Sequence, residues 1–179
     1  AALALVGAIY LSADGNGFQK RDARHPFALA VMLAPYQLGA WINSRIWTRH
    51  HPRPDAIIDD VWLGPLPRAE DMRTGTPGGF SALFDLCAEL PAPRGDWRYA
   101  YQPWLDLIPP TEAQLREAAH TIDSLRGNGP VLVCCALGYS RSACAVLAWM
   151  LITGRAGSVD EAMRIVRARR PHIVLSAQH

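Results

Sequence analysis

Five short apolar segments of the chain have the length and composition expected of β-strands. Two of them are separated only by Asp59 and Asp60, which favours a strand pair. Two others are apolar almost throughout and are typical of buried strands. The five segments are residues 56–58, 61–63, 81–87, 98–102 and 131–135.

Three helices are predicted between and after these strands. Thr111 and Gln114 form a capping box, after which apolar residues recur at helical spacing. Residues 141–153 predict a mostly apolar helix, and a second capping box at Ser158 opens a helix that stops before Pro171. The order of strands and helices implies an α/β layer architecture.

Two apolar segments precede these elements. Residues 1–13 are too short to span a bilayer alone, which takes about 20 residues. Residues 27–47 are long enough and contain no charge before Arg45. Polar residues and Pro35 within this second segment leave open an interfacial helix or a helix packed on the domain. We expect membrane association through residues 1–47.

A polar, proline-rich stretch follows the second apolar segment and is typical of a linker. It divides the chain into residues 1–54, an apolar N-terminal segment with its linker, and residues 55–179, which we expect to form one soluble domain. Half of the 179 residues are apolar, so the chain can bury one sizeable core.

Charge and cysteine content narrow the classes of function. The net charge is only +2 and the arginines are scattered, so nucleic acid is not the expected partner. The four cysteines have neither the paired spacing of a zinc site nor the density of a disulfide scaffold. We expect reduced thiols in a reducing, cytoplasmic compartment. Basic residues flank both ends of residues 27–47, which leaves open the side of the membrane that the domain faces.

The most informative motif is C-x-x-G-x-x-R-S, which begins at Cys135. By residue frequencies, the full pattern arises by chance in roughly 0.003 of such chains. The five residues after Cys135 can curl so that their backbone N–H groups converge on a phosphate at the start of the next helix. Arg141 supplies a planar fork for two phosphate oxygens. The phosphate-binding residues are therefore Ala136, Leu137, Gly138, Tyr139, Ser140 and Arg141.

The same field of N–H groups stabilises a thiolate, which makes Cys135 a candidate nucleophile. Its attack on phosphorus would give a cysteinyl-phosphate, and the leaving oxygen would then need a general acid. Asp106, in an aromatic and proline-rich loop, is the candidate, although a turn or capping carboxylate is the alternative interpretation. Ser142 could donate to the departing thiolate.

These residues resemble the dual-specificity branch of the cysteine-based protein tyrosine phosphatases over about residues 57–178. Residues 61–67 and the Arg169-Arg-Pro171 motif belong to the same resemblance. It implies a central sheet flanked by helices, with no metal or cofactor. The family usually has histidine before the nucleophile, where this chain has Cys134. Cys134 is expected to be a small buried residue, with redox protection of Cys135 as the alternative. The catalytic roles that the resemblance implies fall on Cys135, Arg141, Ser142 and Asp106.

Three functions remain open at this point. The loop between Cys135 and Arg141 carries no further positive charge for a polyanionic headgroup, which favours protein phosphotyrosine or phosphoserine/threonine as the substrate. The apolar N-terminal segments favour a membrane lipid phosphate. A phosphate-binding pseudophosphatase is the alternative of another class.

Overall fold

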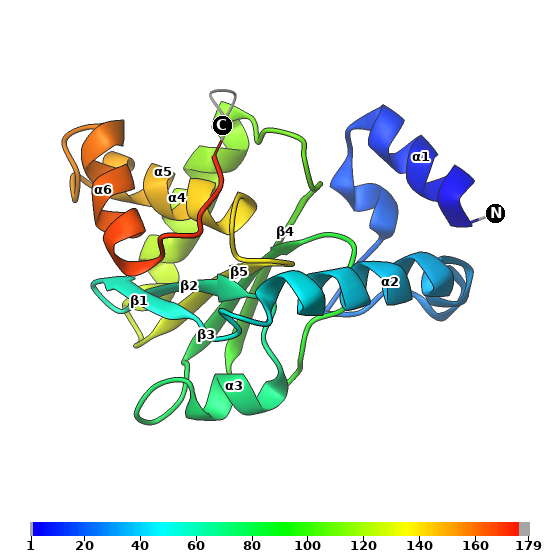
Figure 1. Ribbon diagram of the computed structural model, residues 1–179, viewed down its shortest axis with the longest axis horizontal. Coiled ribbons are helices and arrows are strands. Elements are labelled where there is room, and N and C mark those ends of the chain that lie inside the picture. The colour runs from blue at the N-terminus through cyan, green and yellow to red at the C-terminus, as the bar shows by residue number, and fades with distance from the viewer. Residues whose placement is uncertain (1, 176–179) are drawn as a thin grey trace.

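The computed structural model describes residues 2–175, which fold around one mixed sheet. The strand order is β1-β2-β5-β3-β4; β1 and β2 are antiparallel, and the other neighbours are parallel (Figure 1). All five predicted strands are present. They are β1 (Asp55–Ile58), β2 (Val61–Pro65), β3 (Ala82–Cys87), β4 (Arg98–Trp104) and β5 (Val131–Cys135).

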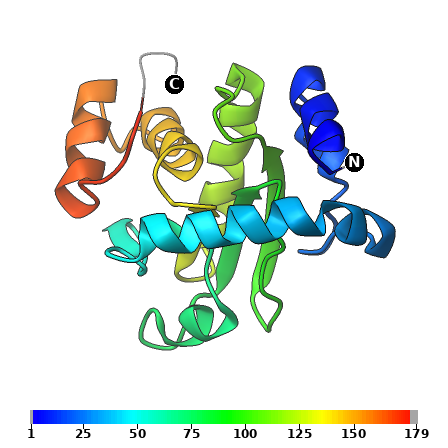
Figure 2. The ribbon, with the colours of Figure 1, turned by 45° about the vertical axis from the view of Figure 1, so that its right-hand side comes forward.

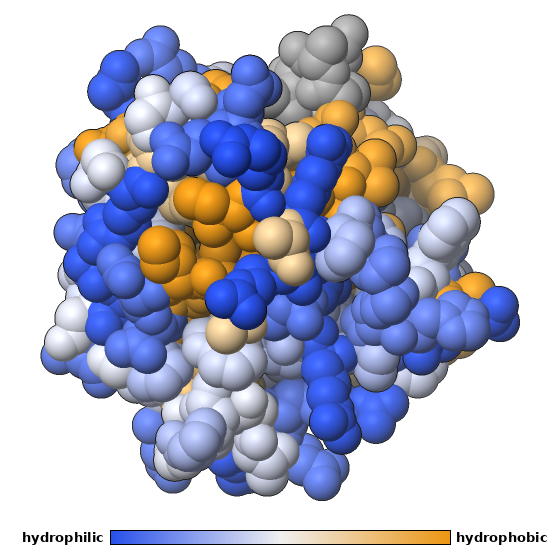
Figure 3. All heavy atoms as spheres, turned by 60° about the vertical axis from the view of Figure 1, so that its left-hand side comes forward, coloured by the Kyte–Doolittle hydropathy of each residue, from blue (hydrophilic) through white to orange (hydrophobic). Residues whose placement is uncertain are grey.

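Helices lie against both faces of this sheet. Helices α4, α5 and α6 gather on one side, while α2 crosses in front of the strands in Figure 2, with α1 beside it. The side that carries α6 is mainly hydrophilic, with an apolar area near its centre (Figure 3). The helices are α1 (Ala2–Ser12), the 3-10 turn η1 (Gly15–Phe18), α2 (Phe27–Thr48), α3 (Ala69–Thr74), α4 (Glu112–Arg126), α5 (Arg141–Ile152) and α6 (Val159–Arg169).

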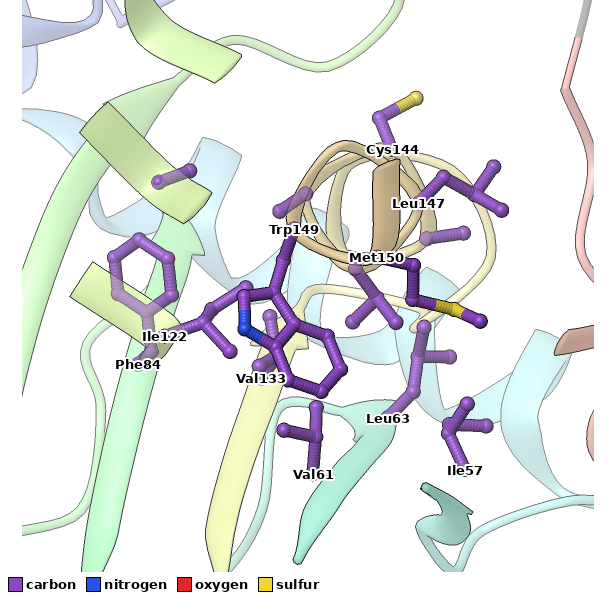
Figure 4. Packing of buried hydrophobic residues seen from close by; sticks show 14 of the residues in the cluster. Ile57, Val61, Leu63, Phe84, Ile122, Val133, Cys144, Leu147, Trp149 and Met150 are labelled. Carbon is purple, nitrogen blue, oxygen red and sulfur yellow. The ribbon is translucent and has the colours of Figure 1, made fainter. Parts of the chain in front are cut away.

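The main core lies between the sheet and α4, α5 and α6. Trp149 of α5 is fully buried there, against side chains such as Phe84 of β3 and Val133 of β5 (Figure 4). Alternate residues of the same strands, including Leu83 and Leu132, enter a second core on the opposite face. Because both faces of the central strands are covered, these strands are apolar almost throughout.

Local signals in the sequence correctly predicted several boundaries. Asp59 and Asp60 both have positive φ, +49° and +61°, and form the two-residue turn between β1 and β2. The Thr111 Oγ1 accepts a hydrogen bond from the Gln114 N–H, and the Gln114 side chain accepts one from the Thr111 N–H, which completes the capping box of α4.

The α2 helix corrects one expectation. Across residues 2–175, every helix is too short or too polar to cross a membrane. Residues 27–47 are therefore not a spanning segment, because polar side chains such as Gln37 and Asn43 interrupt the apolar run. Pro35 lies inside the helix, and Leu33 is completely buried. The sequence analysis left two other possibilities for residues 27–47, an interfacial helix and a helix packed on the domain.

A buried ion pair attaches the N-terminal segment to the sheet. The Lys20 ammonium donates hydrogen bonds to the Asp85 carboxylate of β3 at 2.5 Å and to the carbonyls of Cys87 and Leu90 at 2.7 and 2.6 Å. Both charged side chains are fully buried. Burial, the largest single influence, would lower the pKa of Lys20, but the charge and hydrogen bond of Asp85, with smaller contributions from neighbouring groups, together raise it.

Apolar contacts reinforce this attachment. Ile9, Phe18 and Leu33 form one cluster with Ala88 and Leu105, which belong to the loops after β3 and β4. These contacts join residues 2–54 to residues 55–175, and the predicted division at residue 54 stays a prediction.

We expect Lys20→Met to lower the free energy of unfolding by about 3–5 kcal/mol, because Asp85 would remain buried without its cation. Urea denaturation measures this change. The matched control is Arg116→Met, which removes an exposed ion pair with Glu112 and should cost less than about 1 kcal/mol. A Lys20→Met variant as stable as the control would show that the pair does not anchor the segment.

Candidate active site

The predicted phosphate cradle is the loop between β5 and α5. Gly138 has φ +69°, and a Cβ there would lie 2.2 Å from the backbone carbon of Gly64 and 2.5 Å from the nitrogen of Pro65. A side chain at this position would therefore clash with the backbone at the end of β2. The glycine of the motif is required both by its conformation and by this close approach.

The Arg170 side chain contacts the backbone of the cradle loop. It is fully buried, and its Nε donates to the Gly138 carbonyl at 2.8 Å, while Nη1 donates to the Asp55 carboxylate at 2.7 Å. Since the C=O and N–H of a peptide plane point in opposite directions, this contact turns the Tyr139 N–H away from Arg170. Arg170 thus helps to fix the direction of the N–H groups of the loop.

The sulfur of Cys135 lies at the base of the cradle, and the residue is 2% exposed. Its Sγ accepts a hydrogen bond from the Gly138 N–H at 3.2 Å and lies 3.3 Å from the Ser142 hydroxyl oxygen. Both groups can stabilise negative charge on this sulfur.

Arg141, the first residue of α5, is held by a carboxylate that the sequence analysis missed. Its Nη1 and Nη2 donate to the two oxygens of Glu89 at 2.9 and 2.7 Å, and Nη1 also donates to the Trp104 carbonyl at 2.9 Å. The Arg141 Nε is buried and has no hydrogen-bond partner within residues 2–175. The guanidinium is therefore fixed on one edge and keeps a donor available on the other.

Glu89 is itself held in place by the N-terminal segment. The Gln37 amide of α2 lies 3.0 Å from His25 Nδ1 and donates to the Glu89 carbonyl at 3.2 Å, while His25 Nε2 lies 3.1 Å from the Ala88 carbonyl. Burial, the largest single influence, would raise the pKa of the Glu89 carboxyl, but the charge and hydrogen bonds of Arg141, with smaller hydrogen-bond contributions, together lower it, so the pair stays ionised. The one sequence signal for Glu89 was a single acid after the apolar strand.

Asp106 lies in the loop after β4, at the mouth of the site. Its Oδ1 is 3.4 Å from the Arg141 Nη2, and its side chain is 44% exposed. A cleft of about 430 Å³ brings Asp106 together with Glu89 and with Ala136 and Leu137 of the cradle. The structure thus gathers Cys135, Arg141, Ser142 and Asp106 around one site, and their catalytic roles stay predictions.

The remaining predicted residues of the cradle have structural contacts. The Tyr139 hydroxyl donates to the Trp47 carbonyl at 3.0 Å, and Ser140 caps α5 without a side-chain hydrogen bond.

Within residues 2–175, no group of three or more His, Cys, Asp or Glu side chains is arranged to hold a metal ion.

Cys134 faces the opposite side of the sheet from Cys135. Its side chain belongs to the second core, where its sulfur lies 4.0 Å from the Asp85 carboxylate, whereas Cys135 borders the main core. Burial raises the pKa of the Cys134 thiol well above its ordinary value. This placement favours the interpretation of Cys134 as a buried core residue.

Comparisons with known proteins agree with this geometry. A family model described as the dual specificity phosphatase catalytic domain matches residues 80–179, which is more than half of the chain. This match and the structural neighbours confirm the predicted family resemblance and the α/β fold, with a central mixed sheet flanked by helices. Comparison with curated proteins finds no match.

Three solved structures illustrate the likeness. A single-substitution variant of human DUSP28 is 21% identical with a TM-score of 0.61, covering 71% of this chain and 88% of that chain. Tk-PTP in its active form is 26% identical with a TM-score of 0.60, covering 72% and 91%. PTPMT1 in complex with PI(5)P is 20% identical with a TM-score of 0.59, covering 68% and 86%.

We expect Glu89→Gln to weaken binding of orthovanadate by roughly 10–100-fold, because losing a charged, two-point hydrogen bond costs about 1.5–3 kcal/mol and leaves Arg141 less firmly oriented. Calorimetric titration measures the affinity. Glu112→Gln, in an exposed pair with Arg116, is the control and should bind as the wild type does. Equal affinity in Glu89→Gln and the control would remove the positioning role of Glu89.

Proposed function

The chain belongs to the dual specificity phosphatase catalytic-domain family, and from this premise we propose that it hydrolyses phosphate monoesters through a cysteinyl-phosphate intermediate. The observation that carries the proposal is the arrangement around the cradle of a buried cysteine sulfur, an arginine whose Nε has no partner within residues 2–175, and an exposed carboxylate 3.4 Å from that arginine. They belong to Cys135, Arg141 and Asp106.

In the first step, the phosphate lies in the cradle and accepts hydrogen bonds from backbone N–H groups and from the free edge of Arg141. The Cys135 thiolate attacks phosphorus, a P–S bond forms, and the bond to the leaving oxygen breaks. Asp106, protonated at this stage, gives its proton to that oxygen. The Glu89 pair keeps the guanidinium plane fixed while the charge on the phosphate moves.

In the second step, water attacks the phosphorus of the cysteinyl-phosphate. Asp106, now ionised, accepts a proton from the water, and the P–S bond breaks to release inorganic phosphate. The Ser142 hydroxyl, 3.3 Å from the sulfur, donates a hydrogen bond to the departing thiolate. The thiolate is then ready for the next cycle.

Phosphotyrosine and phosphoserine/threonine in proteins are the first candidate substrates. Among the described residues that line the cleft, none is lysine, arginine or histidine, so a headgroup with several phosphates would find no second cation there. The family match supports a phosphorylated substrate in general.

A membrane lipid phosphate is the second candidate, and the surface of α2 favours it. Phe27, Val31, Leu38 and Ile42 recur at helical spacing on one face of α2, and each is 44–85% exposed. Trp41, 46% exposed, is of the residue type that gathers at membrane interfaces. PTPMT1, one of the structural neighbours, was crystallised with PI(5)P. We propose that residues 1–47 hold the chain at a membrane surface.

A phosphate-binding pseudophosphatase is the alternative without turnover. The presence of a candidate nucleophile, an arginine and a candidate acid around one cradle argues against it. Side-by-side turnover of a phosphotyrosine peptide, a phosphoserine peptide and phosphatidic acid separates all three candidates.

We expect Cys135→Ser to abolish turnover of every substrate in this panel while orthovanadate binding remains measurable, because the backbone cradle does not depend on the thiol. The control is Cys144→Ser, which makes the same change at a different cysteine, one that lies in α5. Substantial phosphatase activity in Cys135→Ser would refute the covalent mechanism.

The leaving group tests Asp106, because a general acid matters most when the departing oxygen carries negative charge poorly. We expect Asp106→Asn to slow hydrolysis of an alkyl phosphate by about 10²–10⁴-fold and of nitrophenyl phosphate far less. Asp96→Asn, in the turn before β4, is the control. Equal losses on both substrates would move the proton donor elsewhere and leave Asp106 a structural residue.

A further inference from the structure

The N-terminal helices form most of the wall of the catalytic cleft. Eight of the twelve residues that line it come from α1 and α2, and the remaining four are Glu89, Asp106, Ala136 and Leu137. A volume of about 430 Å³ is within the range of small-molecule sites, so the cleft has room for more than the phosphate.

Among the described residues, this wall is mainly apolar, with Asn43 and Ser44 as polar side chains, and carries no cation. Leu3 of α1 and Pro35 and Ala40 of α2 line it, together with Tyr10 and Tyr36. Burial, followed by the nearby Glu89 carboxylate, raises the pKa of both tyrosines, so their hydroxyls stay neutral. The wall therefore offers apolar contact and neutral hydroxyls to whatever group carries the phosphate.

Charge in the cleft limits the number of phosphates. Among the described residues that line the cleft, none is a cation, and Arg141 reaches its edge by pairing with Glu89 and lying 3.4 Å from Asp106. A second phosphate would therefore find no further cation among the described residues of the cleft. One phosphate subsite beside an apolar wall fits a monoester with a single phosphate.

Gly39 of α2 gives this wall its depth. A Cβ at Gly39 would meet no atom within 4 Å, so neither packing nor a close approach requires a glycine there. Glycine within a helix is less stable than alanine by about 0.5–1 kcal/mol. The missing side chain leaves open space over the cradle, where a larger residue would occupy the cleft.

We propose that α1 and α2 form a substrate-selecting wall that admits a phosphate monoester with a single phosphate on an apolar body, with Gly39 as a specificity-determining residue. This inference rests on the proposed phosphatase function and names its substrate class. Phosphotyrosine and a phosphatidate both carry a single phosphate monoester on an apolar body. The comparison of substrates described next separates the two.

The experiment compares Gly39→Leu with Gly7→Leu, the same change in α1 at a glycine that does not line the cleft and where a Cβ also meets nothing within 4 Å. The substrates are nitrophenyl phosphate, a phosphotyrosine peptide, dioctanoyl phosphatidic acid and dioctanoyl phosphatidylinositol bisphosphate. The measured quantity is kcat/KM for each, divided by that for nitrophenyl phosphate.

In Gly39→Leu, we expect this ratio to fall at least about tenfold for the peptide or for phosphatidic acid, whichever body occupies the cleft, because even one methylene in a pocket is worth about 10–200-fold and leucine adds more than that. Gly39→Ala should give a smaller fall, and Gly7→Leu none. The wild type should hydrolyse the better single-phosphate substrate at least tenfold more efficiently than the bisphosphate. An unchanged ratio for both bodies, or a preference for the bisphosphate, overturns the inference.

Failure of the proposed function is a separate result. If the wild type does not hydrolyse nitrophenyl phosphate, the phosphatase proposal fails, and binding of the phosphotyrosine peptide and phosphatidic acid to the unreacting protein tests the wall. Weaker binding of either ligand to Gly39→Leu than to Gly7→Leu supports the wall. Equal binding of both ligands to the two variants overturns it.

Discussion

The pairing of Arg141 with Glu89 is the interaction on which the site depends. A buried guanidinium is tolerated only when an ionised partner and hydrogen bonds compensate for its lost hydration. Here Glu89 and the Trp104 carbonyl use one edge of Arg141, and the buried Nε is left for a ligand. The orientation of the Arg141 guanidinium is therefore set by the loop after β3 and by the last residue of β4, and not by the cradle alone.

The N-terminal segment supports the same pair from outside. Lys20 fixes the end of β3 through hydrogen bonds to Asp85 and to two backbone carbonyls. His25 contacts the backbone carbonyl of Ala88, and Gln37 donates to that of Glu89. Lys20 and Cys134 also contact Asp85 together. Cys134, which stands where the family usually has histidine, thus contacts the same carboxylate as Lys20 of the N-terminal segment.

Local sequence patterns predicted most helices and strands, but they did not predict the ion pairs between residues far apart in the chain. The strand, loop and helix around Cys135 follow one another in sequence, and so their order could be inferred from periodicity and glycine positions. Glu89 pairs with a residue 52 positions away and Lys20 with one 65 positions away, which no local pattern encodes. The short helix α3 was also missed, because six residues give too little periodicity to recognise. Its cap involves Arg68 and Asp71, an uncommon pair of residue types.

The close approach of Gly138 to Gly64 has a consequence for folding kinetics. The cradle takes its shape only when β5 has paired with β2, and these strands are far apart in the chain. Parallel pairings between distant segments form slowly, because loop-closure entropy is lost before the contacts are gained. The anion-binding loop therefore matures together with the centre of the sheet, and a partly folded chain with native-like helices alone has no assembled cradle.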